Sequence, residues 1–77
     1  MEELKIGGKY TNYKNPNKTY ELIAQGRNSE TLEEVIIYKA LYSGDYPTGQ
    51  VWVRPKKMFF EIVEYKGNKV PRFKLIK

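Results

Sequence analysis

Short runs of strand-forming residues alternate along this chain with groups of turn-forming residues. The runs are KYTNY, TYELIAQ, EEVIIYKALY, QVWVR, FFEIVEY and VPRFKLI, and their Tyr, Val, Ile and Phe side chains pack well on a pleated surface. Gly, Pro and Asn gather between the runs, in NPNK, GRNSET, SGDYPTG, RPKK and KGNK. Turn signals that recur about every 8–12 residues are typical of a small sandwich or barrel. We therefore predict an all-β fold, a small barrel of five or six antiparallel strands.

Two segments carry a helical signal. Thr31 to Glu34 has the Thr-x-x-Glu spacing of a capping box. The residues that follow, VIIY, are β-branched and continuous, so we favour a tight turn that feeds a buried strand. In the second segment, Pro55 is expected to begin a short helical turn over PKKM, with Met58 closing one end of the barrel.

The last two runs can be paired as a hairpin around KGNK. With a four-residue loop over Lys66 to Lys69, the residue numbers of each cross-strand pair add up to 135, so that Phe60 faces Leu75 and Ile62 faces Phe73. This loop also turns Pro71 so that its missing backbone donor points outward. With the same alternation applied to the other runs, the central core is predicted to contain Leu22, Val35, Ile37, Leu41, Val51, Val53, Phe60, Ile62, Phe73 and Leu75.

The composition limits the kind of protein this can be. The chain has 77 residues and 40% hydrophobic side chains, which suits one folded domain over residues 1–77 with a single small core. Whether residues 1–6 are ordered or disordered is left open by the sequence. The first residues lack the pattern of a signal or transit peptide, and no window approaches a membrane span. We therefore expect a cytoplasmic protein without membrane contact.

Several chemistries are disfavoured by the residues that the chain lacks. It contains no cysteine and no histidine, so disulfides, thiolate zinc sites and the usual general base at neutral pH are missing. The adjacent pair Glu33 and Glu34 would point to opposite faces of a strand and could not share a metal ion. We predict no catalytic residue, cofactor or metal site, and hence no enzyme. The weaker alternative is a hydrolase that uses Glu61 or Glu30 with Lys or Arg in a concave pocket.

The C-terminal third combines positive charge with aromatic side chains. Residues 51–77 carry eight basic and two acidic residues, within a net charge of +5. If Val51 and Val53 face the core, alternation places Trp52 and Arg54 on the outer face, with Arg72 and Lys74 on the outer side of the final strand. Basic groups beside an aromatic ring suit phosphate contacts and base stacking. The alternative is a buried Trp52 on which Arg54 stacks, with the other charges serving solubility.

Several motifs occur together in an order that resembles a known family. SETLEE with the following VIIYKALY, then WVRPKKMFFE and VPRF, are similar to the family catalogued as domain of unknown function 1653, short bacterial proteins. The resemblance covers about residues 8–76 and implies an SH3-like β-barrel without an established activity. The family pattern has His before SET, where this chain has Asn28, so the resemblance carries no proton-transfer role to this position.

These observations lead to one functional hypothesis and one alternative. The hypothesis is a non-catalytic binding module that contacts nucleic acid or an acidic protein partner through Trp52, Arg54, Arg72 and Lys74. The alternative is a structural or assembly protein that presents a strand edge or a tyrosine-rich patch. A monomer or a weak homodimer is compatible with both.

Overall fold

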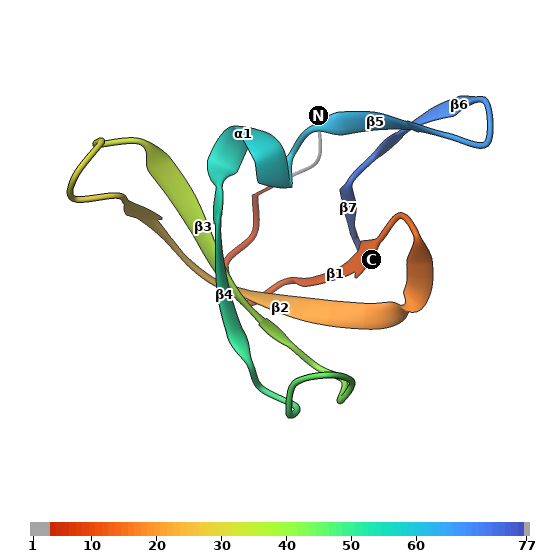
Figure 1. Cartoon of the computed structure of the whole chain (residues 1–77), viewed down its shortest axis with the longest axis horizontal. Coiled ribbons are helices and arrows are strands. Elements are labelled where there is room, and N and C mark those ends of the chain that lie inside the picture. Colours follow the sequence, from red (N-terminus) through yellow and green to blue (C-terminus); the bar gives the residue numbers. More distant parts are fainter. Residues whose placement is uncertain (1–3, 77) are drawn as a thin grey trace.

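Seven strands and one short helix make up residues 4–76, the part of the chain that this computed structural model describes (Figure 1). The elements in chain order are β1 (Lys9–Asn12), β2 (Asn15–Arg27), β3 (Glu34–Ala40), β4 (Val51–Pro55), α1 (Lys56–Phe59), β5 (Ile62–Tyr65), β6 (Asn68–Pro71) and β7 (Phe73–Leu75). The predicted all-β fold and the short helical turn after Pro55 are confirmed. None of the helical segments within these residues is long and apolar enough to cross a membrane.

The strands form two antiparallel sheets. The larger sheet has the strand order β4-β3-β2-β1-β7, and β5 pairs with β6 in a separate hairpin that projects from the rest of the molecule (Figure 1). The two sheets are not closed into a barrel. The long strand β2 pairs with β1 through its first half and with β3 from Tyr20 to Arg27, so it joins the two sides of the larger sheet.

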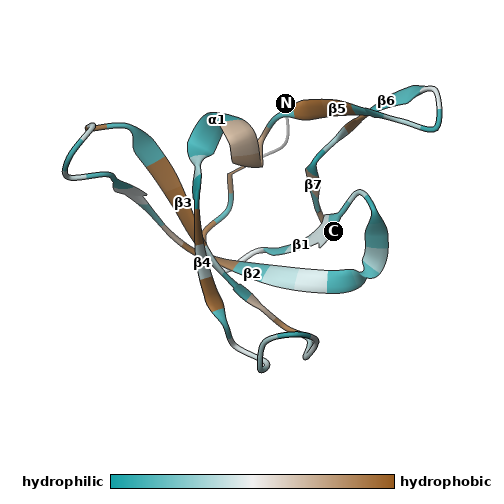
Figure 2. Cartoon of the chain, in the orientation of Figure 1, coloured by the Kyte–Doolittle hydropathy of each residue, from teal (hydrophilic) through white to brown (hydrophobic). Residues whose placement is uncertain are grey.

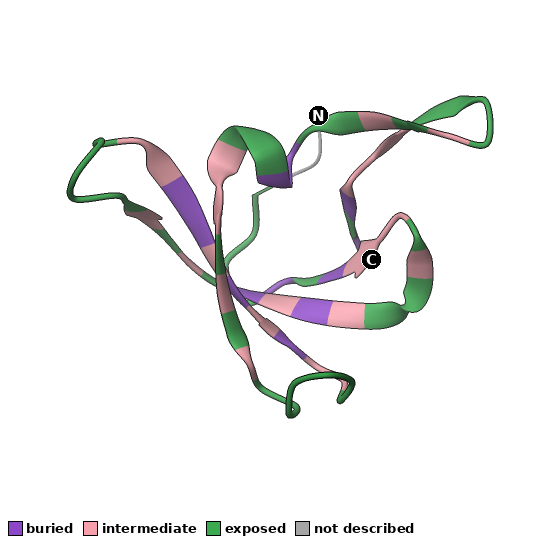
Figure 3. Cartoon of the chain, in the orientation of Figure 1, coloured by how far each residue is buried: buried purple, intermediate pink, exposed green. Residues whose placement is uncertain are grey.

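The core lies on the inner face of the larger sheet and is mostly aromatic. Phe59 from α1 and Phe73 from β7 stack at a centroid distance of 4.3 Å with nearly parallel rings. The rings of Tyr10 and Tyr38 meet Phe59 edge to face at 5.4 and 5.2 Å. Buried residues of β2, β3, α1 and β7 therefore converge on one centre (Figure 3). The short helix contributes the central ring, Phe59, and fills the space inside the curled sheet.

The predicted core is partly confirmed. Leu22, Val35, Phe60, Phe73 and Leu75 are buried, and Ile37 and Leu41 are half-buried. The predictions for Val51, Val53, Ile62 and Met58 are wrong, because 49%, 62%, 51% and 42% of their surfaces are exposed. Small valines would leave the wide inner space of this sheet poorly filled, and the buried positions are occupied instead by tyrosine and phenylalanine rings.

The connection between β2 and β3 is the tight turn that the sequence predicted. Asn28 Oδ1 accepts hydrogen bonds from the backbone N–H groups of Glu30 at 2.8 Å and Thr31 at 3.3 Å. The N–H of Leu32 donates to the Asn28 carbonyl at 2.7 Å. Asn28 thus holds the turn through its short side-chain amide, as asparagine commonly does.

The final hairpin does not have the predicted register. Tyr65 pairs with Asn68 and Ile62 with Pro71, so the pairs sum to 133 and the loop has two residues, Lys66 and Gly67. Both loop residues have positive φ, 53° and 81°, as a type I′ turn requires. The chain then leaves this hairpin at Arg72, whose N–H donates to the Glu61 carbonyl at 2.8 Å and whose carbonyl accepts from the Tyr13 N–H at 3.0 Å.

This exchange of partners at Arg72 explains why Ile62 and Phe73 do not meet. Strand β7 pairs with β1, with Leu75 opposite Tyr10 and Phe73 opposite Asn12. Phe73 thereby enters the core from the larger sheet, whereas Ile62 stays on the projecting hairpin. The start of strand β5 is hydrophobic in Figure 2, yet the strand alternates between exposed and half-buried positions in Figure 3.

The start of the chain is held against β1 and β2 from Leu4 onward. The Lys5 N–H donates to the Tyr10 hydroxyl at 3.0 Å, and the Gly7 N–H donates to the Leu22 carbonyl at 2.7 Å. Of residues 1–6, for which disorder was one option, residues 4–6 therefore have defined positions. Residues 1–3 lie outside the described part.

The turn at Lys66 gives a first testable prediction. Lys66→Asn should raise the free energy of unfolding by up to about 1 kcal/mol, because asparagine tolerates the left-handed conformation better than lysine and Asn-Gly is the preferred type I′ pair. Urea unfolding followed by circular dichroism measures this change. Lys69→Asn, which places asparagine in β6 instead, is the control and should not stabilise. Equal effects of the two substitutions would contradict the role of the turn.

Candidate functional site

Strand β4 directs Trp52 and Arg54 to the inner face of the larger sheet. Trp52 pairs with Tyr38 and Arg54 with Ile36 on β3, and both partners are buried core residues. Trp52 is half-buried and packs against the core. The expected alternation is confirmed, but the faces are reversed, since the valines on either side of Trp52 point outward.

Trp52 forms one wall of a groove of about 270 Å³ at the end of the sheet. Its indole meets the Tyr46 ring at 5.1 Å and 84°, which gives the groove an aromatic corner. Tyr42 provides a third ring, and the Lys18 ammonium lies 5.3 Å from its centroid. The complete lining is Lys18, Ala40, Tyr42, Gly44, Asp45, Tyr46, Gln50 and Trp52. We call this the Trp52 groove.

A pair of tyrosine hydroxyls links the Trp52 groove to the core. The hydroxyls of Tyr20 and Tyr42 are 2.8 Å apart and hydrogen-bonded, and the two rings meet edge to face at 5.4 Å. Burial raises the pKa of Tyr20 above its ordinary value, and the hydrogen bond to Tyr42 raises it further. Tyr20 therefore stays neutral at physiological pH and supports Tyr42 as a fixed wall rather than acting as a base.

Arg54 is anchored beside this aromatic cluster. Its Nε donates to the Tyr38 hydroxyl at 3.2 Å, and its guanidinium carbon lies 5.6 Å from the Phe73 ring centroid. Arg54 is half-buried, so its charge is screened less than that of a surface lysine. It adds positive charge two residues beyond Trp52, on the same face of β4.

A second group of aromatic and basic side chains lies where the β1–β2 turn meets the β5–β6 hairpin. Tyr13 and Tyr65 contact each other edge to face at 5.3 Å. The Lys14 ammonium and the Arg72 guanidinium lie 5.8 and 5.9 Å from the Tyr13 centroid, and the Lys66 ammonium lies 5.2 Å from that of Tyr65. We call these five residues the tyrosine cluster.

The four residues of the predicted binding surface are divided among three places. Trp52 lines the groove with Arg54 beside it, and Arg72 belongs to the tyrosine cluster, where it bonds Glu61 at 2.8 Å. Lys74 lies exposed on β7 between the buried Phe73 and Leu75, so it points away from the core. The nitrogen Nε of Arg72 is buried and has no hydrogen-bond partner among residues 4–76.

Most of the aromatic partners in these two places were missed from the sequence. Tyr46 reaches Trp52 from the Ser43–Gly49 loop, which the sequence marked only as a connection. Tyr13 and Tyr65 are 52 residues apart in the numbering, and they meet only because the hairpin folds back at Arg72. The Tyr-Lys pair at 13–14 recurs at 65–66, but it also occurs at 38–39, where the tyrosine is buried in the core, so the repeat alone does not identify this cluster.

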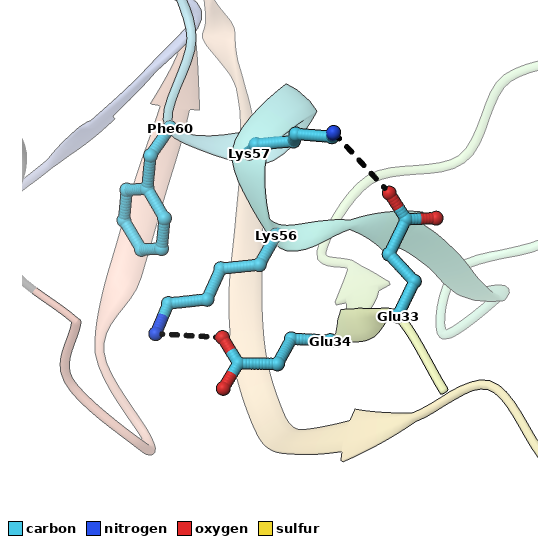
Figure 4. Close-up of a pocket in the computed structure, with 5 residues that line it drawn as sticks. All are labelled: Glu33, Glu34, Lys56, Lys57 and Phe60. Atoms are coloured by element: carbon cyan, nitrogen blue, oxygen red, sulfur yellow. Dashed lines mark ion pairs between the residues drawn. The ribbon is translucent and has the colours of Figure 1, made fainter. Parts of the chain in front are cut away.

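A larger pocket, of about 440 Å³, lies between β3 and α1 (Figure 4). Its four charged groups form pairs across the pocket: Lys56 with Glu34 at 3.3 Å and Lys57 with Glu33 at 3.9 Å. The remaining wall is Phe60. These mutual pairs leave no net charge for a ligand. Glu61 and Glu30, named in the hydrolase alternative, line neither of these two pockets, and residues 4–76 hold no group of acidic residues that could bind a metal.

Comparison with known proteins places this architecture in a family. The family described as "Protein of unknown function (DUF1653)" matches residues 8–75. The chain belongs to this family. A crystal structure of a DUF1653 protein from Bordetella bronchiseptica is similar, with a TM-score of 0.81 and 26% sequence identity over 96% of this chain and 88% of that one. No curated protein matches the chain.

Proposed function

We propose that this DUF1653 protein is a non-catalytic module that binds single-stranded nucleic acid, with one base held in the Trp52 groove. The observation that carries the proposal is the meeting of three aromatic rings, from Trp52, Tyr46 and Tyr42, with the Lys18 ammonium in one concave site. An aromatic wall stacks any base, because every base has a π face. The ammonium supplies the phosphate contact that an aromatic wall alone lacks.

The polar residues of the groove suit the edge of a base. Gln50 offers an amide donor and acceptor, and Asp45 offers an acceptor, at the rim of the aromatic walls. An acidic peptide would use the cations but would leave the rings without a stacking partner. This difference favours a nucleic acid over an acidic protein as the ligand.

The tyrosine cluster extends the same chemistry along the molecule. The segment from Tyr13 to Lys18 joins it to the groove, since Lys14 lies in the β1–β2 turn and Lys18 lies near the start of β2. Among the described residues, Lys14, Lys18 and Lys66 have no acidic partner within ion-pair distance. Unpaired cations beside aromatic rings are free to contact the phosphates of an extended strand.

The proposal is tested by fluorescence anisotropy with a labelled 12-nucleotide oligothymidine at low salt. We expect binding that quenches Trp52 fluorescence and weakens as salt rises, because each phosphate contact releases a counterion. Trp52→Leu should weaken binding about tenfold, in line with about 1–3 kcal/mol per stacked base. Lys18→Gln should weaken it less and should also lower the salt dependence.

The charge-matched control is Lys57→Gln, which removes one positive charge from the larger pocket. It should leave the affinity close to that of the unmodified protein. If Lys57→Gln weakens binding as much as Lys18→Gln, the contact is unspecific attraction and the proposed site is wrong. If an acidic peptide of equal charge displaces the oligonucleotide and perturbs Trp52 equally, the ligand is an acidic partner instead.

A further inference from the structure

Strand β4 forms an edge of the five-stranded sheet, since β3 is its neighbour on one side and the sheet order of the described residues ends with β4 on the other. Edge strands present unpaired backbone groups, and natural proteins usually protect them with charges, bulges or covering segments. Here the exposed side chains of β4 are Val51 and Val53, which are 49% and 62% exposed. Figure 3 shows these exposed positions along β4.

The alternation of hydrogen-bonded positions between β3 and β4 shows which backbone groups of β4 point away from β3. The Ala40 N–H donates to the Gln50 carbonyl at 2.9 Å, so Gln50 is at a position bonded to β3. Alternation along an antiparallel pair then directs the backbone groups of Trp52 and Arg54 to β3 and those of Val51 and Val53 to the free edge. Pro55, which has no N–H, ends this row of outward donors.

We propose that two copies of this chain associate through antiparallel pairing of their β4 strands, related by a twofold axis at Trp52. In this arrangement Val51 of one copy lies opposite the partner's Val53, and Val53 lies opposite the partner's Val51. Each of these two pairs makes two backbone hydrogen bonds. The interface therefore gives partners to the N–H groups of Val51 and Val53 and to the Val53 C=O on both copies, and it adds a second donor to the Val51 C=O, which accepts from Gln50 Nε2 at 3.3 Å.

The sequence of β4 is complementary to itself in this register and less so in the neighbouring ones. The charged Arg54 comes opposite the neutral Gln50 of the partner, so no like charges face each other across the ladder. Moving the axis to Val53 would instead place Pro55 opposite the partner's Val51 on both sides of the axis, and each of these two pairs would lack one of its two hydrogen bonds, because proline has no donor. Moving it to Val51 would bring the partner's Gly49 opposite Val53, although the Gly49 N–H already donates to the Ala40 carbonyl at 2.8 Å.

The outer face of the sheet also favours a second copy over a charged partner. Val53 pairs with Ile37 on β3, and Ile37 pairs with Ala24 on β2, so an apolar row crosses three strands. Pairing through β4 continues this row from one copy into the next, with valine beside valine at the join. The inference is argued from the backbone edge and the outer face of β4 and not from nucleic-acid binding, although the axis also places the Trp52 side chains of the two copies opposite each other on the groove face.

Sedimentation velocity over a wide concentration range tests the association. We expect the unmodified chain to dimerise reversibly, and we expect Val53→Lys to raise the dimer dissociation constant at least tenfold. The matched control is Ile62→Lys, which puts the same charge at a similarly exposed position, 51%, on the β5–β6 hairpin. It should leave the dissociation constant unchanged. A monomer at every concentration, or a dimer that Ile62→Lys weakens as much as Val53→Lys, would overturn the proposal.

Amide hydrogen exchange distinguishes strand pairing from any other contact. The amides of Val51 and Val53 should exchange rapidly in dilute protein and slowly in concentrated protein, whereas the amide of Trp52, bonded to β3, should be protected in both. This readout needs no substitution, so it is unaffected by any variant that fails to fold. Concentration-independent exchange at Val51 and Val53 in a sample that contains dimer would show that β4 is not the interface.

Discussion

Replacing Phe59 by alanine should lower the free energy of unfolding by about 3–5 kcal/mol, the usual cost of removing a buried aromatic ring. Phe59 is fully buried and lies at the centre of the core, with its ring stacked on Phe73 at 4.3 Å and in edge contact with Tyr10 and Tyr38. A chain of this size typically has a total stability of roughly 4–11 kcal/mol. The substitution should therefore remove a large part of the stability, measured by urea unfolding with circular dichroism.

The neighbouring Met58 provides the control for this prediction. Met58→Ala changes the same short helix at a position that is 42% exposed, so it should alter the stability by less than about 0.5 kcal/mol. Phe59→Leu keeps much of the apolar volume and should lose an intermediate amount, which remains measurable if the alanine variant does not fold. A decrease in the free energy of unfolding below about 1 kcal/mol for Phe59→Ala would mean that α1 does not fill the centre of the core.

The period-2 pattern predicted the strands well because it depends only on the local chain. It placed Trp52 and Arg54 on one face and the flanking valines on the other, and the structure has this division. It did not show which face is inside. That choice depends on how much space the curled sheet leaves, and here the space is filled by rings from α1, which follows β4 directly, and from β1, β2 and β7, which are far from β4 in the sequence.

The last hairpin shows where a correct physical argument led to a wrong loop. Pro71 does have its missing donor directed away from the pairing, because Arg72, the next residue, is the one that bonds Glu61. A two-residue turn at Lys66 and Gly67 also places Pro71 at a position that needs no backbone donor. Pro71 therefore did not require the predicted four-residue loop. A lysine at positive φ is uncommon, so a turn with Lys66 in this conformation was not expected.

The candidate site was only partly predictable for a similar reason. Trp52 stands out in the sequence as the single tryptophan beside basic residues, and it lines a groove in the structure. The other groove residues Tyr46 and Lys18 come from a loop and from the start of β2. Their proximity follows from the tertiary fold, which alternation along one strand cannot show.

Gly8→Ala should lower the free energy of unfolding by about 1–3 kcal/mol, the usual cost of forcing an extra carbon into a filled site. Gly8 is buried, and a Cβ atom there would lie 2.9 Å from the Lys5 carbonyl oxygen and 2.9 Å from Leu75 Cδ1. The carbonyl cannot move freely, because the Gly8 N–H donates to it and the Gly7 N–H is bonded to Leu22. The first turn and β7 would have to separate, which opens the core beside Leu75.

The same substitution at Gly44 separates this steric cost from the general effect of replacing glycine. A Cβ atom at Gly44 would be 3.6 Å from the nearest atom, a ring carbon of Tyr42, which is an ordinary contact. Gly44→Ala should therefore change the stability by no more than about 0.5 kcal/mol. If the two variants unfold at the same urea concentration, the segment before β1 is not packed tightly against Leu75. If only Gly8→Ala is destabilised, the close approach of this segment is part of what closes the core.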